Sequence, residues 1–309
     1  MKPLISIVVP VYNSQDCLWK LYEEVDKQLS LFASYELILV NDKSRDKSWD
    51  VIVEISSQKE HVVGVSLRKN SGQDNAIMAG LRIAKGEYIV IMDDDLQHSP
   101  SDISVLYSKC KEGYDVCFAL FTDKQQKVWK NMGSWLNGKL SEKLLSKPKE
   151  IYLSPFKIIK REVILEAIKY SGPFPYLDAI ILSITSNLTQ VEIEHHKRFR
   201  GKSNYSLFRS FSVFVKHATG FSIFPLRLVT FIGLFFSFIS FILGLFYLVD
   251  YFYEGTKVEG WVTLVLLWIF IGGLMLMSVG IIGEYVGRIY LSINNKPQYT
   301  IDRIVSKEK

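Results

Sequence analysis

Two long stretches without a charged residue, Leu228–Val249 and Trp261–Gly283, constrain this chain more than any other feature. As helices rising ~1.5 Å per residue, each would exceed the ~30 Å hydrocarbon core of a bilayer. The sequence before them holds no comparable run. We therefore expect a two-helix transmembrane hairpin at 228–287 behind a large domain at 1–200. An ordinary soluble protein and a multi-span transporter are both disfavoured.

The charges around the two stretches predict their orientation. The connecting segment Asp250–Gly260 carries two Glu, one Asp and one Lys, whereas Arg227 precedes the first stretch and Arg288 and Lys296 follow the second. The positive-inside rule then places both termini, including a tail at 288–309, in the cytoplasm. Gly283 and Gly287 form a small-xxx-small pair that permits close helix packing, either within the chain or between subunits.

The segment directly before the first stretch is basic. Between His196 and Arg227 there are no acidic residues, and aromatic and aliphatic residues alternate with basic ones: Lys197, Arg198, Arg200, Lys202, Arg209, Lys216 and Arg227. This composition predicts an amphipathic juxtamembrane segment at 201–227 that contacts anionic lipid headgroups. The alternative is a solvated face of the preceding domain.

The N-terminal part alternates apolar strands with helical stretches, which predicts an α/β domain with a parallel sheet covered on both faces. The predicted strands are Ile5–Val11, Tyr35–Val40, Val62–Leu67, Tyr88–Met92 and Asp115–Phe121. The helices lie between them at 15–30, 46–57, 73–84 and 101–112. The later part is less regular, with helices expected at Lys124–Leu145 and Glu162–Lys169 and an edge strand at Val191–Glu194.

Composition excludes some classes of function. The net charge of +5 is small for 309 residues, so a whole-molecule nucleic-acid binder is not indicated. The three cysteines have no metal-type spacing and read as reduced cytosolic thiols. No secretory leader is visible at the start, so we expect the C-terminal stretches to direct the chain to the membrane.

Polar clusters follow four of the predicted strands, at Pro10–Ser14, Asn41–Asp46, Asn70–Gln73 and Asp93–His98. Ligands of parallel sheets bind beyond the carboxyl ends of the strands, so these clusters predict one shared site. The alternative is that each cluster only makes a turn or caps a helix.

The acidic run Asp93-Asp94-Asp95 is the strongest chemical signal. Adjacent carboxylates repel one another unless a cation offsets their charge, and hard oxygen ligands suit Mg²⁺ or Mn²⁺. Along extended backbone Asp93 and Asp95 would face one way, with Gln97 extending the row, and Asp94 another. The alternative is an acidic start of the helix that follows Ser99-Pro100.

The other clusters predict contacts with a nucleotide. Asp42 can accept a hydrogen bond from a base such as uracil, whereas Asp46 fits a helix cap. Tyr12 offers an aromatic wall, and Gly72-Gln73 opens a helix whose free N–H groups suit an anion. Each also has a purely structural interpretation as a turn or cap.

A fifth motif, His195-x-x-Arg198-x-x-Gly201-Lys202-Ser203, lies directly before the membrane segment. Cations, a hydroxyl and a glycine that permits close approach suit the capture of a phosphate carried on a lipid. The alternative is a headgroup contact without catalysis. A metal pair formed by His195 and His196 is disfavoured.

Together these motifs resemble glycosyltransferase family 2, and within it the polyprenyl-phosphate glycosyltransferases. The resemblance rests on Val9-Pro10-Val11-Tyr12-Asn13, Asn41-Asp42-x-Ser44-x-Asp46, Asn70-x-Gly72-Gln73, Asp93-x-Asp95-Leu96-Gln97 and Arg198-x-x-Gly201-x-Ser203, and it extends to Gly283-Glu284-Tyr285-x-Gly287-Arg288. It implies a Rossmann-like GT-A domain that performs an inverting, metal-dependent sugar transfer. The donor would be a nucleoside-diphosphate sugar, with UDP favoured, and the acceptor polyprenyl (undecaprenyl) phosphate. The reaction would occur at the cytoplasmic face of a bacterial inner membrane and supply lipid-linked sugar for cell-envelope glycans, with a homo-oligomer, such as a tetramer, as the assembly.

The resemblance also implies roles for individual residues. The nucleotide would contact Pro10, Tyr12, Asn13, Asp42, Gln73 and Asp94, and Mg²⁺ or Mn²⁺ would be held by Asp93, Asp95 and Gln97. Asp93, Asp95 and Arg198 would be catalytic. The acceptor phosphate would meet Lys124, Lys130, Arg198, Arg200, Lys202 and Ser203.

The sequence departs from the family pattern in two respects, at three positions. Ser14 stands where Glu is usual, and Phe121 and Lys124 stand where many relatives carry two Arg. Three alternative functions remain: a family 2 transferase acting on another acceptor, with Asp178 as a base; a non-catalytic nucleotide-sugar-binding scaffold; and a flippase, which two spans would hardly accommodate.

Overall fold

The computed structural model describes residues 3–121, 148, 151–172, 174–193, 224–254, 260–294 and 296–307. The chain divides into two compact units. The first combines Met1–Tyr205 with Asn295–Lys309, and the second is Ser206–Asn294. The fifth motif, residues 195–203, and the expected helix at Lys124–Leu145 lie outside the described residues.

The first unit is built on an eight-stranded sheet with the order β7-β5-β6-β4-β1-β2-β3-β8. Its strands are β1 Ile5–Val11, β2 Tyr35–Asn41, β3 Val62–Leu67, β4 Tyr88–Ile91, β5 Val116–Phe121, β6 Lys157–Lys160, β7 Leu188–Ile193 and β8 Ile301–Ser306. The helices are α1 Leu18–Leu29, α2 Ser48–Gln58, α3 Gln73–Ile83, α4 Ile103–Lys111 with the short η1 Pro100–Asp102 before it, α6 Arg161–Ala167 and α7 Leu177–Ile184. Only β6 and β8 run antiparallel to their described neighbours, which confirms the expected mostly parallel α/β architecture.

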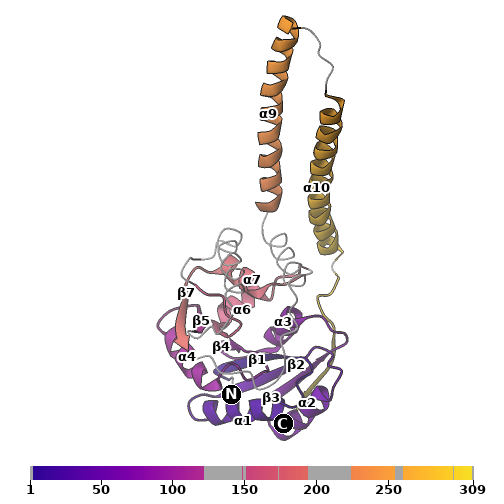
Figure 1. The fold of residues 1–309 in the computed structure, drawn as a ribbon. Helices are drawn as coiled ribbons and strands as arrows, with labels where there is room; N and C mark the ends of the chain where they lie inside the picture. Colours follow the sequence, from indigo (N-terminus) through magenta and orange to yellow (C-terminus); the bar gives the residue numbers. More distant parts are fainter. Residues whose placement is uncertain are drawn as a thin grey trace. The chain divides into compact units, whose positions relative to one another are not determined.

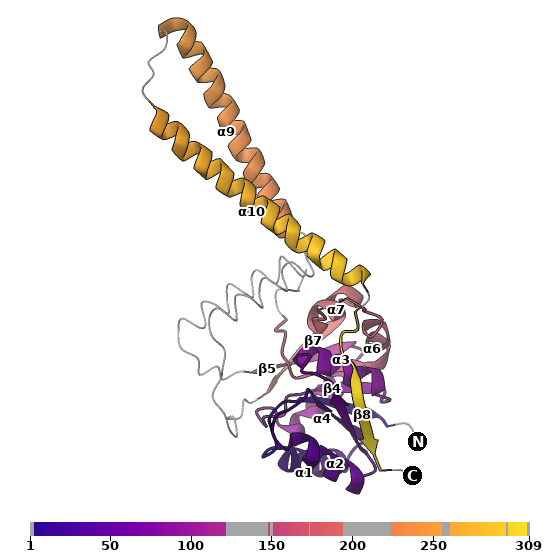
Figure 2. The same ribbon diagram turned by 90° about the vertical axis from the view of Figure 1, so that its right-hand side faces the viewer.

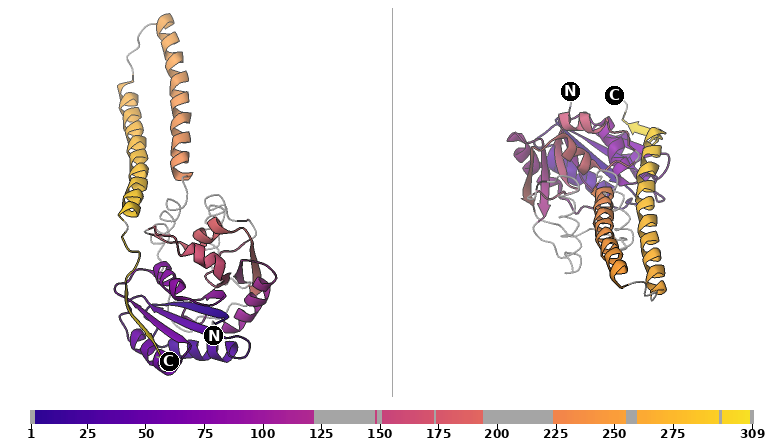
Figure 3. Two further views of the ribbon diagram at one scale, coloured as in Figure 1. Left: turned by 180° about the vertical axis from the view of Figure 1, so that it is seen from behind. Right: turned by 90° about the horizontal axis from the view of Figure 1, so that it is seen from above.

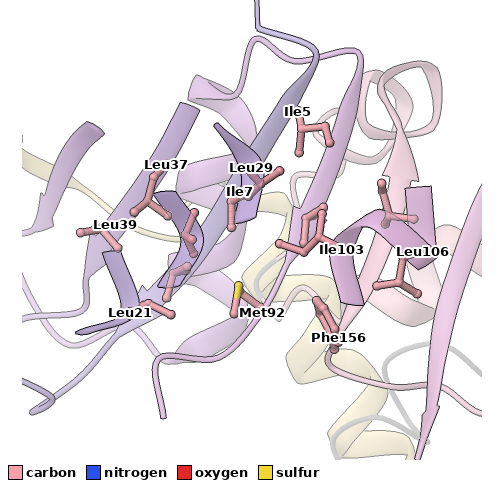
Figure 4. Packing of buried hydrophobic residues seen from close by; sticks show 14 of the residues in the cluster. Ile5, Ile7, Leu21, Leu29, Leu37, Leu39, Met92, Ile103, Leu106 and Phe156 are labelled. Carbon is pink, nitrogen blue, oxygen red and sulfur yellow. The ribbon is translucent and has the colours of Figure 1, made fainter. Parts of the chain in front are cut away.

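Helices cover both faces of this sheet, with α1 and α2 on one side and α3 on the other (Figure 1). Alternate residues of β1, such as Ile5 and Ile7, belong to a core that includes Leu21 of α1 and Ile103 of α4 (Figure 4). Because β1 is buried on both faces, its sequence is apolar except for Ser6 and does not alternate. On the opposite face α3 approaches closely, since a Cβ at Gly80 would lie 2.4 Å from Cγ1 of Val8.

All five predicted strands are present within about a residue or two of their expected bounds. Strand β6 was not predicted, because four residues are too few to establish a period. Strand β7 begins at Leu188, before the expected Val191. Strand β8 was not predicted either, since it lies beyond the membrane stretches in a segment expected to be a tail.

Strand β8 returns the C-terminal segment to the first unit. It pairs antiparallel with β3, and Figures 2 and 3 show it in yellow beside the purple strands of the N-terminal half. The pairing requires a small residue in β3, because a Cβ at Gly64 would lie 2.7 Å from Val305 Cγ2. Arg68 also forms a 3.3 Å ion pair with Asp302. The expected tail at 288–309 therefore contains the end of a helix followed by a strand of the sheet.

The described residues of the second unit include the helices α9 Phe224–Glu254 and α10 Trp261–Ile293. The two predicted apolar stretches lie inside these helices, which contact each other through rings such as Phe236 and Phe270, 5.9 Å apart. Among the described residues, one segment, Phe270–Ile293, is long and apolar enough to cross a membrane. In the described part of the chain no atom lies within 4 Å of a Cβ placed at Gly283 or Gly287, so this glycine pair makes no close packing there.

Candidate functional site

The carboxyl ends of β1, β2 and β4 lie side by side, because these strands are parallel neighbours in the sheet. Hydrogen bonds between side chains and backbone join the segments that follow them. The clusters at Pro10–Ser14, Asn41–Asp46, Asn70–Gln73 and Asp93–His98 are thereby brought into one site, as expected from their positions after strands.

Asp94 connects the loop after β4 to the loop after β1. Its Oδ2 accepts a 2.5 Å hydrogen bond from the Ser14 hydroxyl and a 3.3 Å bond from the Tyr12 backbone N–H. Burial raises the pKa of Asp94 to about 6, although the bonds from Ser14 and Tyr12 act to lower it. Sequence reasoning treated Ser14 only as a departure from a pattern. Its contact with a residue 80 positions away could not be found locally.

Hydrogen bonds join the loop after β1 to the loop after β2. Asn13 has a φ of 56°, a left-handed conformation that Asn tolerates. Its side-chain oxygen accepts from the Arg45 backbone N–H at 2.8 Å, and its own N–H donates to the Ser44 hydroxyl. Asp46 accepts from Ser48 at the start of α2, as predicted for a cap, and from the Gln15 backbone N–H.

The residues predicted to contact the nucleotide differ in how exposed their side chains are. Tyr12 is 44% exposed, so its ring is open to a ligand at this edge. Pro10 lies buried inside β1, opposite Val40 of β2. Pro10 is thus a buried residue of the sheet, and its contact with a base stays a prediction.

Asp42 organises the start of α3. Its two carboxylate oxygens accept hydrogen bonds from the backbone N–H groups of Ser71, at 2.6 Å, and Gly72, at 2.8 Å. Burial raises the pKa of Asp42, and these two bonds partly offset the rise. Gly72 has a φ of 91°, which favours glycine at this turn. Asp42 therefore holds the loop that presents Gln73, a role that the sequence pattern did not predict.

The side chain of Gln73 connects the α3 loop to the acidic run. Its amide Nε2 donates a 2.8 Å hydrogen bond to Asp93 Oδ1. The Asp93 backbone N–H donates to Nδ1 of His98, a buried ring stacked 5.0 Å from Phe156 and 5.5 Å from Phe121. His98 is a supporting residue that was not singled out, and Phe121 stands as part of its stack.

The carboxylate oxygens of the acidic run are of the type that suits a hard divalent cation. Asp93 and Asp94 contact different loops, which agrees with their predicted divergence. Strand β4 nevertheless ends at Ile91, and Leu96 has a φ of 59°, so loop geometry directs these side chains. Among the described residues, no group of three or more His, Cys, Asp or Glu is placed to hold a metal. Mg²⁺ commonly uses only one or two carboxylates and completes its shell with substrate phosphates and water. Asp93 Oδ1 accepts from Gln73 and Asp95 Oδ1 accepts from the Gln97 backbone N–H, and these two residues would supply the carboxylates of such a site.

A buried ion pair lies beside the acidic run. Lys157 on β6 pairs in register with Ile91 of β4, and its Nζ contacts Oδ1 of Asp178 at the start of α7. Burial raises the pKa of Asp74 to about 6, with Asp178 raising it further and Lys157 opposing. Asp178, considered above as a base for another acceptor, is thus engaged by a cation. The acceptor-phosphate candidates Lys124, Lys130, Arg198, Arg200, Lys202 and Ser203 lie outside the described residues.

Comparisons relate this chain to known proteins by sequence and by fold. The model of the family described as glycosyl transferase family 2 matches residues 6–167. The bactoprenol glucosyl transferase of Shigella phage SfII is 30% identical over 97% of this chain and 97% of its own length. The undecaprenyl-phosphate 4-deoxy-4-formamido-L-arabinose transferase of Klebsiella pneumoniae subsp. pneumoniae is 30% identical over 97% of this chain and 93% of its own.

Solved structures support the fold. Glucosyl-3-phosphoglycerate synthase from Mycobacterium tuberculosis, in complex with Mn²⁺ and uridine-diphosphate-glucose, superposes with a TM-score of 0.52. The match covers 70% of this chain and 77% of that chain at 18% identity. At this identity the likeness extends to the fold alone.

Proposed function

Because the chain belongs to glycosyl transferase family 2, we propose that it transfers a sugar from a UDP-sugar to undecaprenyl phosphate. The chain is a glycosyltransferase that uses a nucleotide sugar. The choice of acceptor is supported by relatives of nearly full length whose names specify bactoprenol or undecaprenyl phosphate. We place the reaction at the cytoplasmic face of a bacterial inner membrane, where it supplies lipid-linked sugar for cell-envelope glycans.

One observation carries the proposal: Gln73 joins the α3 loop, held by Asp42, to Asp93 of the acidic run. This places a helix N-terminus, whose N–H groups favour anions, next to carboxylates that suit a divalent cation. Both features suit the diphosphate of a nucleoside diphosphate. The helix N-terminus favours its negative charge, and a cation held by the carboxylates would offset that charge. Tyr12, Asn13, Asp42 and Asp94, with Pro10 behind them, would bind the nucleoside.

The donor diphosphate would lie near Asp93, Asp95 and Gln97, which would hold Mg²⁺ or Mn²⁺. When bound, such an ion offsets the negative charge that develops on the leaving diphosphate. The protein's own part is to orient the donor, with Asp94 fixed by Ser14 and Asp93 by Gln73. Fixed donors and dipoles lower the barrier because they need no reorganisation during the reaction.

The transfer is a single displacement with inversion. An oxygen of the lipid phosphate forms a bond to the anomeric carbon, the bond from that carbon to the diphosphate breaks, and UDP leaves with the electron pair. The phosphate is already anionic near neutral pH, so no strong general base is needed. Arg198, with Lys124, Lys130, Arg200, Lys202 and Ser203, would orient the acceptor phosphate. We further propose that α9 and α10 both cross the membrane, which confines the reaction to the surface where the acceptor lies.

The test is a transfer assay with the full chain purified in detergent. Undecaprenyl phosphate, Mn²⁺ or Mg²⁺ and a panel of UDP- and GDP-sugars are supplied, and both released nucleoside diphosphate and sugar in the lipid extract are measured. Lipid-borne sugar from a UDP-sugar supports the proposal. Nucleotide release without a lipid product indicates another acceptor, and a folded protein that releases nothing indicates a scaffold. Asp93→Ala should abolish metal-dependent turnover, whereas Asp50→Ala, on the exposed face of α2, should not.

A further inference from the structure

His98 is a buried imidazole beside the acidic run, and the reaction described above gives it no part. It lies in the loop between β4 and η1 and is only 4% exposed. A buried histidine needs partners for its ring nitrogens. One of those partners is Asp93, a residue that would hold the cation, so the contacts of His98 bear on how the cation is bound.

Two aromatic rings fix the plane of this imidazole. Phe156, directly before β6, lies 5.0 Å from it with 8° between the ring planes, and Phe121, at the end of β5, lies 5.5 Å from it at 14°. Both phenylalanines belong to the hydrophobic core, in which Figure 4 shows Phe156. Because side chains in a close-packed core keep one orientation, these rings hold the imidazole in one plane.

The ring plane determines the direction in which Nδ1 accepts. The lone pair of Nδ1 lies in that plane, and the atom accepts a 3.3 Å hydrogen bond from the backbone N–H of Asp93. An accepting Nδ1 requires the neutral ring with its proton on Nε2. Since Nδ1 is engaged by the backbone, His98 acts on Asp93 and does not offer this nitrogen to a cation.

The same bond closes a short loop around the acidic run. Asp93 and His98 are five residues apart, and between them Leu96 has a φ of 59°, a left-handed conformation that is unfavourable for leucine. Leu96 packs against the hydrophobic core. Such a conformation persists only where the surroundings determine it, so the loop follows one defined path.

Asp93 is thus held at two points. His98 fixes its backbone, and the amide of Gln73 donates a 2.8 Å hydrogen bond to its Oδ1. Asp95 lies in the same closed loop, where its Oδ1 accepts from the Gln97 backbone N–H at 3.1 Å. A carboxylate binds a cation more tightly when its direction is set beforehand, because no further ordering is then needed on binding.

We infer that His98 is a positioning residue that presents Asp93, through its backbone, to the divalent cation of the donor complex. The inference rests on the proposed function, since that function supplies the cation. Phe121 and Phe156 set the direction of the imidazole, and the imidazole sets the direction of Asp93. His98 itself touches neither the donor nor the cation.

Two substitutions separate the acceptor from the ring. His98→Phe keeps an aromatic ring beside Phe121 and Phe156 but has no acceptor, whereas His98→Asn has an acceptor oxygen at the position of Nδ1 and no ring. If His98 only fills the core, metal affinity and melting temperature change together. If it positions Asp93, the metal affinity follows the acceptor and the melting temperature follows the ring.

The first measurement is hydrogen exchange of the Asp93 amide in the full chain in detergent, resolved to single residues by mass spectrometry with electron-transfer fragmentation. His98→Phe should exchange this amide about tenfold faster than the unaltered protein, and His98→Asn at nearly the unaltered rate. The measurement requires neither cation nor donor, so its failure is distinct from failure of the proposed function. Equal rates in the two variants overturn the inference.

The second measurement is the affinity for Mn²⁺ in the presence of UDP, from the electron paramagnetic resonance signal of free Mn²⁺. His98→Phe should weaken it about tenfold, and His98→Asn should keep it while lowering the melting temperature by several degrees. Unchanged affinity in folded His98→Phe overturns the inference, whether or not His98→Asn folds. An unaltered protein that binds no Mn²⁺ contradicts the proposed metal site, and the inference with it.

His61→Phe is the matched control. His61 directly precedes β3, at the opposite end of the strands, where its ring stacks on Tyr22 at 5.8 Å and its Nε2 lies 2.7 Å from the Tyr35 hydroxyl. The substitution should lower the melting temperature and leave both Asp93 exchange and Mn²⁺ affinity unchanged. If it alters them as His98→Phe does, the effect belongs to any lost stacked histidine, and the inference is overturned.

Discussion

The hydroxyl of Ser14 donates a 2.5 Å hydrogen bond to Oδ2 of Asp94, and this bond joins the loops after β1 and β4. The same carboxylate oxygen accepts from the Tyr12 backbone N–H. Asp94 is therefore oriented from the loop that carries the exposed Tyr12 ring. A position that departs from the family pattern thus has a defined structural task in this chain.

Ser14→Ala should weaken donor binding. Loss of a hydrogen bond to a charged group corresponds to about 1.5–3 kcal/mol, so we expect KM for the donor to rise by about tenfold or more, with a smaller change in kcat. Steady-state kinetics of nucleotide release measure both constants. Ser14→Thr keeps the hydroxyl and is the matched control. An unchanged KM in Ser14→Ala would show that Asp94 does not orient the donor.

Asp94→Asn should stabilise the protein at neutral pH while reducing activity. Burial raises the pKa of Asp94 from its usual 3.8 to about 6, so the folded protein binds the proton more tightly than the unfolded chain. The free energy of unfolding therefore falls as pH rises through this interval, by up to about 3 kcal/mol.

The melting temperature gives the measurement. Asp94→Asn should melt at a higher temperature than the unaltered protein at pH 8, and the difference should shrink as pH falls and vanish below about pH 3, where the carboxyl is neutral in both states. The exposed Asp50→Asn should show no such pH dependence. A constant difference at every pH would mean that the charge of Asp94 is not the cause.

Asp42→Asn should disturb the α3 loop and, through it, the donor site. An Asn side chain has one acceptor oxygen, so its NH₂ group would face the N–H of Ser71 or Gly72. We expect the donor KM to rise by about tenfold to a hundredfold. Asp115→Asn is the control. Asp115 directly precedes β5, at the opposite end of the strands from the candidate site, and its carboxylate accepts a hydrogen bond from the Thr185 hydroxyl. That variant should lower the melting temperature without changing KM.

Lys157→Met should destabilise the first unit by about 3–5 kcal/mol, because it leaves Asp178 buried without its cation. Thermal unfolding measures the loss. Adding Asp178→Leu should recover a large part of it, since the uncompensated charge is then removed as well. A double variant no more stable than Lys157→Met would show that lost packing, and not an unpaired carboxylate, causes the effect.

The sequence alone was sufficient to predict the α/β class, the first five strands of the chain and the four polar clusters that follow strands of the sheet. Strand periodicity and turn residues are local signals, and the carboxyl ends of parallel strands meet at one edge whatever the loop details. The apolar stretches inside α9 and α10 were equally visible, because length and lack of charge suffice to indicate them.

Only the tertiary structure determined which residues form hydrogen bonds and ion pairs with one another. Ser14 with Asp94, Asp42 with the N–H groups of Ser71 and Gly72, and Lys157 with Asp178 are contacts between segments distant in sequence. The same holds for β8, which pairs with β3 although both long helices separate the two strands in the sequence. A residue's type limits which bonds it can form, but the strand order of the folded sheet determines which neighbour is within reach.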